Sequence, residues 1–188
     1  IYRDVTQRKN LERELQRLAT TDMLTGMANR RAFLECAESV YAHSRGNGEP
    51  LTLLMLDLDH FKAINDRFGH LEGDRALAAF AHAVKGQLRA SDSVGRLGGE
   101  EFGVLLPLTA LAEGVEVATR ILQGVRALQL ADEAGHGYRI TASLGVGAFR
   151  QSDRRLRDLL DRADQALYQA KRRGRDQIAG HEEEVSSP

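Results

Sequence analysis

The chain has 188 residues, of which 26 are Lys or Arg and 27 are Asp or Glu, so its formal net charge is −1. This length and a composition of 42% hydrophobic and 28% charged residues predict one principal globular domain. The near-zero charge argues against a generic binder of nucleic acid or of acidic membranes. The single cysteine, Cys36, excludes an internal disulfide and favours a reducing compartment.

The chain is expected to work in the cytoplasm without membrane contact of its own. Its longest apolar run, residues 51–56, is far too short to cross a bilayer, and charged residues interrupt any signal peptide at the N-terminus. A full-length protein that contains this chain could still be membrane-anchored through another segment.

The first twenty residues differ from the rest. Residues 1–5 are typical of the end of a strand, and residues 7–18 predict a polar helix with one narrow apolar seam, formed by Leu11, Leu15 and Leu18. Two interpretations of this helix are open: it docks on its own domain, or it connects to an upstream sensor domain. Residues 3–9 resemble the closing strand and exit of a PAS sensor domain, which favours the connector.

Helical and strand patterns alternate along the remaining chain. Helices are predicted over residues 28–42, 73–88, 110–128 and about 152–173, and strands over 51–56, 93–97, 101–106, 138–149 and weakly 177–179. Gly98-Gly99 lies between two of the strands and predicts a tight hairpin. The alternation with one central hairpin indicates an α/β or α+β fold, followed by an acidic tail, residues 180–188, that is expected to be disordered.

An acidic motif, Asp57-Leu58-Asp59, follows the most apolar predicted strand. A carboxylate held rigidly at a strand end suits Mg²⁺, which prefers hard oxygen ligands. A strand-terminal aspartate is also common as a helix cap or turn residue, so the motif alone leaves both interpretations open.

A second acidic motif is Gly98-Gly99-Glu100-Glu101 in the predicted hairpin. The glycines permit a sharp turn and let a ligand approach the bare backbone. By itself this motif favours a solvated hairpin tip. Two carboxylate sites at strand ends that can face each other favour metal-assisted phosphoryl or nucleotidyl transfer.

Lys171 and Arg175 are four residues apart at the end of the last predicted helix. They could hold terminal phosphates, or they could simply complement the helix dipole. The sequence contains no Walker loop, HExxH motif, cysteine cluster or Gly-x-Ser-x-Gly elbow, so functions based on those motifs are not supported.

Taken together, these motifs resemble the GGDEF domains of bacterial diguanylate cyclases, in the Gly-Gly-Glu-Glu-Phe spelling. The similarity begins at Asp22-Met23-Leu24-Thr25-Gly26, continues through residues 57–74 and the signature at 96–102, and extends to 143–146 and 163–175. It covers roughly residues 21–179, which leaves residues 1–20 as a sensor-domain exit strand and signalling-helix linker. Asp176 stands where asparagine is common in the family.

The resemblance implies a ferredoxin-like central sheet, similar to nucleotidyl cyclases and polymerase palms, with surrounding helices and a β-hairpin that carries the signature. It implies that Asp57, the Leu58 carbonyl and Glu100 hold Mg²⁺ or Mn²⁺, with Glu100 also a candidate base. Lys62 would stabilise charge on the α-phosphate of GTP. Whether Asp59 or Glu101 contacts metal stays open.

The resemblance also implies a substrate site. Asn65 and Asp74 would read the guanine edge, while His70 either assists or is structural. It implies four further substrate-binding residues. Gly98 and Gly99 lie at the signature turn, and Lys171 and Arg175 would hold the outer phosphates.

The implied reaction joins two GTP molecules, one on each subunit of a homodimer, into cyclic di-GMP and two pyrophosphates. Arg89, Asp92 and Arg120 match the family's product-inhibition site, at which cyclic di-GMP binds. The alternative is a non-catalytic receptor that binds cyclic di-GMP or GTP. In either case the predicted partners are these nucleotides and an upstream sensor domain, without nucleic acid.

Overall fold

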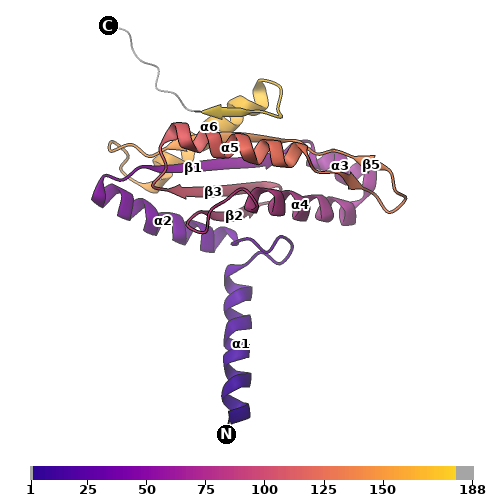
Figure 1. The fold of residues 1–188 in the computed structure, drawn as a ribbon, viewed down its shortest axis with the longest axis horizontal. Helices are drawn as coiled ribbons and strands as arrows, with labels where there is room; N and C mark the ends of the chain where they lie inside the picture. Colours follow the sequence, from indigo (N-terminus) through magenta and orange to yellow (C-terminus); the bar gives the residue numbers. More distant parts are fainter. Residues whose placement is uncertain (1, 181–188) are drawn as a thin grey trace.

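A five-stranded sheet with the order β2-β3-β1-β6-β7 forms the centre of the computed structural model, which describes residues 2–180 (Figure 1). The pairs β2–β3, β3–β1 and β1–β6 are antiparallel, and the pair β6–β7 is parallel. The strands are β1 (Leu51–Leu58), β2 (Ser93–Gly98), β3 (Glu101–Pro107), β6 (Ala142–Ala148) and β7 (Ile178–Gly180). A separate short hairpin joins β4 (Leu130–Ala131) and β5 (Gly137–Tyr138).

Helices cover both faces of the sheet, so the predicted mixed fold is confirmed. The helices are α1 (Tyr2–Thr20), α2 (Arg30–Asn47), α3 (Phe61–Phe68), α4 (His70–Lys85), α5 (Leu111–Arg126) and α6 (Leu156–Arg172). The predicted disordered tail lies outside the described residues, apart from Gly180, which ends β7.

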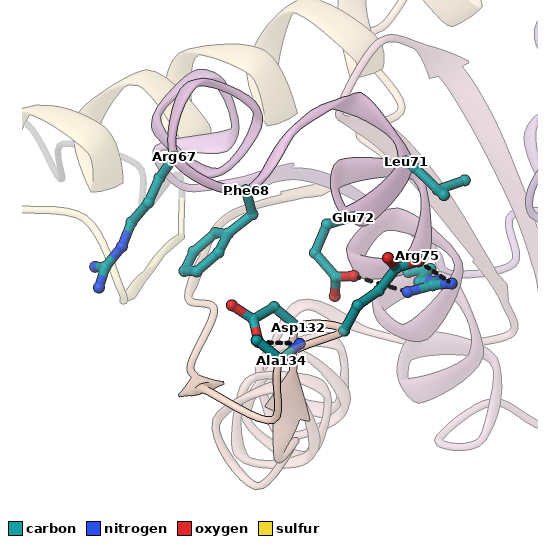
Figure 2. Close-up of a pocket in the computed structure, with 8 residues that line it drawn as sticks. Arg67, Phe68, Leu71, Glu72, Arg75, Asp132 and Ala134 are labelled. Atoms are coloured by element: carbon teal, nitrogen blue, oxygen red, sulfur yellow. Dashed lines mark hydrogen bonds and ion pairs between the residues drawn. The ribbon is translucent and has the colours of Figure 1, made fainter.

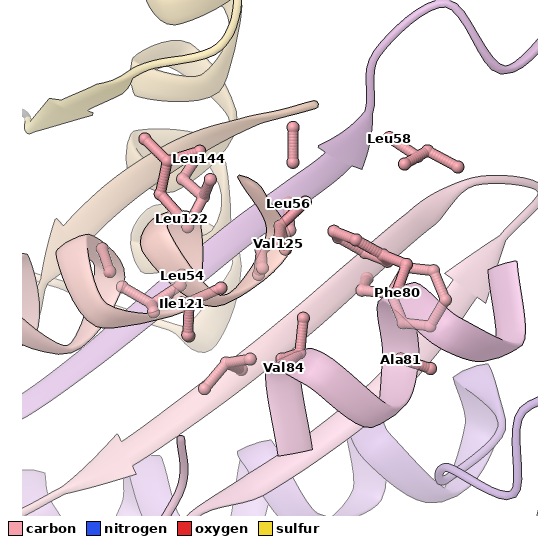
Figure 3. Close-up of a cluster of buried hydrophobic side chains, with 14 of the residues drawn as sticks. Leu54, Leu56, Leu58, Phe80, Ala81, Val84, Ile121, Leu122, Val125 and Leu144 are labelled. Atoms are coloured by element: carbon pink, nitrogen blue, oxygen red, sulfur yellow. The ribbon is translucent and has the colours of Figure 1, made fainter. Parts of the chain in front are cut away.

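Strand β1 is buried along its whole length, which explains why it reads as a continuous apolar run. Because successive side chains point to opposite faces, Leu54, Leu56 and Leu58 join the core under α4 and α5. Figure 3 shows this core, in which Phe80 and Ile121 come from the two helices. The alternate residues of β1 pack under α2 and α6 with a second buried group: Leu51, Leu53, Met55, Phe33, Tyr41, Leu105, Leu159 and Leu167.

Strand β6 lies directly beneath α6, and its glycines make this contact possible. A Cβ atom added at Gly145 would lie 2.2 Å from both the carbonyl oxygen of Ala163 and the nitrogen of Leu167. The close packing brings the C-terminal end of α6, which carries Lys171, to the sheet.

Helix α1 extends away from the sheet (Figure 1), and Leu11, Leu15 and Leu18 are 62%, 57% and 50% exposed. The interpretation of a helix docked on its own domain is therefore wrong for the described residues. The predicted strand end at the N-terminus is also wrong over residues 2–5, which form the first turn of α1. No strand of the described chain adjoins them, and a helix satisfies its backbone hydrogen bonds internally.

The segment between α1 and α2 pairs with the edge of the sheet. Ala28 accepts a hydrogen bond from the Arg96 N–H at 2.9 Å and donates its own N–H to the Val94 oxygen at 3.2 Å, so it forms a bridge beside Gly95 of β2. Asn29 caps α2 by accepting from the Ala32 N–H. Its side-chain amide also donates to the Ala19 oxygen at 2.9 Å, which connects the end of α1 to the start of α2.

Several predicted boundaries are shifted in the structure: α2 continues to Asn47 rather than ending at residue 42, and α4 begins at His70 rather than at residue 73. The last helix begins at Leu156 rather than near Ser152, because the Asp153 carboxylate instead accepts hydrogen bonds from the Arg150 N–H and the Arg162 guanidinium. The predicted strand 138–149 is divided between β5 and β6. None of the helices in residues 2–180 is long and apolar enough to cross a bilayer.

Candidate functional site

Asp57 lies at the end of β1, in register with Glu101 of β3 on one side and Ser143 of β6 on the other. Its side chain is only 8% exposed, and Oδ2 lies 2.8 Å from the Lys171 ammonium nitrogen. Burial raises the pKa of the Asp57 carboxyl; the nearby Lys171 lowers it, and the charges of Glu100 and Glu101 raise it further. Asp57 is therefore a buried carboxylate that needs a neighbouring cation.

The signature hairpin brings Glu100 next to the end of β1. Gly99 and Glu100 form the turn, one residue later than predicted, and Gly99 has a φ of +46°, which favours glycine. The Leu58 N–H donates to the Glu100 carbonyl oxygen at 3.2 Å, and the Leu58 side chain is buried in the core. Only the backbone of Leu58 is thus available to a ligand at this edge.

Arginine side chains support the signature turn, a role that the sequence analysis missed. Arg96 donates to the Gly99 oxygen at 2.8 Å and to the Asp22 carboxylate at 3.3 Å. Asp22 also accepts from the N–H and the hydroxyl of Thr25. The Arg30 guanidinium donates to the Leu97 oxygen at 3.1 Å. In the sequence, the only signal for this role was that Asp22 and Arg96 belong to two family-like motifs, at 22–26 and 96–102, which the structure places side by side.

Asp59 is a structural residue in this fold. One carboxylate oxygen accepts from the Ser143 hydroxyl at 2.7 Å, and the other accepts from the Thr141 hydroxyl and the Asp176 N–H, both at 2.9 Å. The side chain is 4% exposed and connects β1 to β6 and to the turn after α6. With its oxygens bonded in this way, Asp59 does not need a metal to be stable.

Lys62 and Asn65 lie on α3, and His70 and Asp74 lie on the first turns of α4. The Oδ1 atom of Asn65 is buried and has no hydrogen-bond partner among the described residues. It lies against Gly73, where an added Cβ atom would approach it to 1.8 Å. Lys62, His70 and Asp74 are exposed, so α3 and α4 present one unpartnered buried acceptor and three accessible polar groups.

Lys171 and Arg175 both lie at the end of α6, but only Lys171 contacts the acidic site. Arg175 is exposed in a turn with φ of +65°, and the next residue, Asp176, donates its N–H to Asp59. Asp176 also accepts from the Arg126 guanidinium at 2.8 Å, so the acidic residue at this position ties the turn to α5. Arg175 is consequently held near the same edge of the sheet as Asp57.

The donor set at this edge fits a hard divalent cation. Among residues 2–180, no three His, Cys, Asp or Glu side chains converge as a complete metal site. Asp57 and Glu100 nevertheless lie at the same end of the sheet, close enough for the Glu100 charge to act on the Asp57 carboxyl, and carboxylate oxygens are ligands that Mg²⁺ combines with water and substrate phosphates. The buried Asp57 carboxylate, now paired with an ammonium, is the observation that supports this fit.

The predicted product-inhibition residues lie together, away from the acidic edge. Arg89, Asp92 and Arg120 line a small cavity of about 70 Å³ between β3, α5 and the loop before β2, with Thr109, Glu113 and Glu116 among the other lining residues. Asp92 accepts the Arg89 N–H at 2.8 Å, which closes the turn. The structure therefore brings these three residues into one pocket.

Comparison with known proteins places these features in one family. The family model described as "Diguanylate cyclase, GGDEF domain" matches residues 19–177. The chain is 43% identical over 169 residues to diguanylate cyclase DgcP of Pseudomonas aeruginosa and 40% identical over 176 residues to response regulator PleD of Caulobacter vibrioides. These matches cover 90% and 92% of the chain but only 25% and 38% of the two relatives.

Solved structures agree with the sequence comparison. The coiled coil and GGDEF domain of DgcB from Caulobacter crescentus, in complex with c-di-GMP, superposes with a TM-score of 0.87 at 29% identity and covers 95% of this chain and 94% of that one. The active GGEEF domain of a diguanylate cyclase from Vibrio cholerae gives 0.77 at 32% identity and covers 82% and 97%. The chain therefore belongs to the GGDEF domain family of diguanylate cyclases.

Proposed function

We propose that this chain is a catalytically active diguanylate cyclase domain that converts two GTP molecules into cyclic di-GMP and two pyrophosphates. The observation that carries the proposal is the grouping of Asp57, Glu100 and Lys171 at one end of the sheet. Two carboxylates suit Mg²⁺, and an ammonium suits the phosphates of a bound triphosphate. In this proposal the domain works in the cytoplasm.

Asp57, the Leu58 carbonyl and Glu100 would hold Mg²⁺ or Mn²⁺. The cation, when bound, supplies charge neutralisation to the reacting phosphate. Lys62, exposed at the start of α3, would stabilise negative charge on the α-phosphate. When the nucleotide binds, Lys171 would leave Asp57 and contact an outer phosphate, and Arg175 would contact the same phosphates.

The guanine base would lie between α3 and α4. The Asp74 carboxylate would accept from the base N1–H and 2-amino group, and the Asn65 carboxamide would turn away from Gly73 so that its unpartnered oxygen accepts a further hydrogen bond. His70 lies next to this site at the start of α4. Gly98 and Gly99 carry no side chains and would let the nucleotide approach the hairpin backbone.

The reaction requires two copies of the domain, facing each other. The 3′-oxygen of each GTP forms a bond to the α-phosphorus of the other, Glu100 accepts the 3′-hydroxyl proton, and pyrophosphate leaves. Two P–O bonds form and two break per cyclic di-GMP. Because rate depends on how closely the half-sites meet, α1 would transmit the state of an upstream sensor domain by setting their separation.

Cyclic di-GMP would inhibit the enzyme at the pocket of Arg89, Asp92 and Arg120. Arginine forks suit phosphates and the guanine edge, while the Asp92 carboxylate suits the guanine N–H donors. The two similar structures of the DgcB GGDEF domain are complexes with c-di-GMP, which supports product binding by this type of domain.

A non-catalytic cyclic di-GMP receptor is the alternative. The same Arg89 pocket favours it, but Asp57 and Glu100 are both present, and a receptor has no need of them. Binding of cyclic di-GMP without any turnover of GTP would support the receptor.

The decisive experiment measures cyclic di-GMP formation from GTP with Mg²⁺ at protein concentrations where the chain dimerises. The parent should produce cyclic di-GMP, and Glu100→Gln should lower the rate about a thousandfold or more, because it removes a metal carboxylate and the candidate base. Glu38→Gln, an exposed change on α2, is the matched control. The absence of product from the dimeric parent would contradict the proposed activity.

A further inference from the structure

The short β4–β5 hairpin packs against the junction of α3 and α4, beside a cavity of about 320 Å³. Figure 2 shows this cavity, with Arg67 and Phe68 at the end of α3, Leu71, Glu72 and Arg75 on α4, and the hairpin loop opposite. The family motifs do not include the hairpin, and the proposed chemistry does not use it. Its contacts with Phe68 and Glu72 nevertheless lie within three residues of Asn65 and Asp74, which are predicted to read the base.

Glu72 is the centre of these contacts. It is 5% exposed on the first turn of α4, where a negative charge is favoured by the helix dipole. The Tyr138 hydroxyl of β5 donates to its Oε1 atom at 2.5 Å, and Arg75 donates to Oε2 at 3.2 Å. Arg75 also contacts Glu133 in the hairpin loop at 3.2 Å, so both ends of the hairpin are connected to α4.

Tyr138 also contacts α3. Its ring stacks on Phe68 with a centroid separation of 4.7 Å and an interplanar angle of 26°. Phe68 ends α3, and Gly69, with a φ of +88°, connects it to α4. Tyr138 therefore binds one helix by its ring and the other by its hydroxyl, on the two sides of the Gly69 connection.

The relative position of α3 and α4 matters because each helix carries one base-reading residue. Asn65 is one turn before Phe68, and Asp74 is two residues after Glu72. The contact of Asn65 with Gly73 leaves no room even for a methyl group between the helices. A small change in the angle between α3 and α4 would thus move Asn65 and Asp74 relative to each other.

We propose that Tyr138 and Glu72 are positioning residues for guanine recognition, which hold Asn65 and Asp74 at the spacing that matches the guanine edge. This inference rests on the proposed function only for the identity of the base. Hydrogen bonds to a base depend on short distances, so misplacement of Asp74 weakens its contact with the 2-amino group more than it weakens contacts with the phosphates.

The test compares Tyr138→Phe with Tyr41→Phe. Both changes remove one tyrosine hydroxyl and keep the ring; the Tyr41 hydroxyl donates to the Asp153 oxygen at 3.1 Å on the opposite face of the sheet. The probes are the Mg²⁺ complexes of 3′-deoxy-GTP and 3′-deoxy-ITP, which lack the nucleophilic hydroxyl and differ only in the 2-amino group. Calorimetry gives the affinity of each variant for both probes.

Tyr138→Phe should weaken 3′-deoxy-GTP about fivefold and reduce the preference for it over 3′-deoxy-ITP about threefold or more, since a misplaced acceptor loses discrimination. Tyr41→Phe should leave this preference unchanged. A preference in Tyr138→Phe equal to that of the parent would overturn the proposal and leave Tyr138 with a purely structural role. Thermal unfolding verifies that both variants are folded.

A second pair of variants keeps the test independent of the tyrosine. Glu72→Gln retains an oxygen acceptor for Tyr138 and should largely keep the guanine preference, whereas Glu72→Ala should lose it to the same extent as Tyr138→Phe. Equal preferences in the two Glu72 variants would count against the inference.

The outcomes separate this inference from the proposed activity. A parent protein that binds and discriminates the two probes but forms no cyclic di-GMP would contradict the cyclase activity and leave the positioning role intact. A parent that binds the probes without discriminating guanine from hypoxanthine would overturn the positioning role alone, and a parent that binds neither probe would overturn both.

Discussion

The ammonium nitrogen of Lys171 lies 2.8 Å from Oδ2 of Asp57, so the residue proposed to hold phosphate neutralises the residue proposed to hold metal. This pairing connects the end of α6 to the end of β1 on the face of the sheet that α6 covers. It satisfies a buried carboxylate from within the chain, and arrival of a magnesium nucleotide would supply each member with a new partner of opposite charge.

Lys171→Met should lower the free energy of unfolding by about 1–2 kcal/mol in the absence of divalent cations, because it leaves the Asp57 carboxylate buried without a cation. Urea denaturation measures this effect. Lys171→Arg keeps the charge and should lose less. Equal stability of the parent and the methionine variant would show that the ion pair contributes nothing to folding.

Asp22→Asn should destabilise the protein by about 1–2 kcal/mol at pH 7, since it weakens the contacts with Thr25 and Arg96. Although burial favours the protonated form, these hydrogen bonds and the Arg96 charge hold the pKa of the Asp22 carboxyl below its ordinary value of 3.8. The stabilisation is therefore present above pH 3.8 and is lost as the pH falls through the lower folded-state pKa.

Unfolding curves of the parent and Asp22→Asn from pH 7 downward check this dependence. The two should converge only as the pH falls below 3.8. Asp161→Asn is the control, because Asp161 pairs with Arg157 on the surface, where an ion pair contributes about 0.5 kcal/mol or less. If the stability difference between the parent and Asp22→Asn instead grew toward acidic pH, it would contradict a lowered pKa of Asp22.

Asp59→Asn should reduce stability by about 2–3 kcal/mol while its affinity for Mn²⁺ stays within about threefold of the parent. The carboxylate bonds to Thr141, Ser143 and the Asp176 N–H, and it is not proposed as a ligand. Titration of Mn²⁺ followed by electron paramagnetic resonance measures the affinity. Asp57→Asn is the matched comparison and should lose Mn²⁺ binding; a similar loss in Asp59→Asn would make Asp59 a ligand.

Gly145→Ala should destabilise the fold by about 3 kcal/mol or more, because the new Cβ would lie 2.2 Å from backbone atoms of α6 that cannot move alone. Gly46→Ala is the control within α2. No atom lies within 4 Å of its added Cβ, so it should stabilise the helix by about 0.5 kcal/mol. Chemical denaturation of both variants tests whether β6 and α6 are packed this closely.

Arg89→Ala and Arg120→Ala should each weaken cyclic di-GMP binding about tenfold or more, since each removes a guanidinium from the shared pocket. Calorimetric titration with cyclic di-GMP measures the loss, and Arg157→Ala, on the exposed face of α6, is the control. Unchanged affinity in both pocket variants would place the product elsewhere.

The sequence predicted the central strands because burial leaves a clear pattern in them. Strand β1 is covered on both faces and reads as an apolar run, and the paired glycines before Glu101 identify the hairpin. It did not predict α3, which has eight residues and begins after His60 in a left-handed conformation with no side-chain cap. It also missed β4 and β5, whose two residues each are too few to show a period.

The acidic motifs of the site were apparent from the sequence, but their pairing was not. The Lys171–Asp57 contact and the three bonds of Asp59 join residues more than eighty positions apart, so they depend on the folded sheet rather than on local pattern. The same is true of Arg96, whose bond to Asp22 spans 74 positions. Motif spacing identifies such residues, but it does not show whether a residue supports the fold or binds a metal or nucleotide.

The bridge between Ala28 and β2 has a consequence for how two copies of the domain can meet. Strand β2 is an edge strand, and the outward-facing groups Val94 C=O and Arg96 N–H are already bonded to Ala28. An open edge would invite a second copy to continue the sheet, strand against strand, and would lead to open-ended aggregation. Because Ala28 occupies this position, the segment that joins α1 to α2 blocks strand-to-strand pairing at this part of the β2 edge.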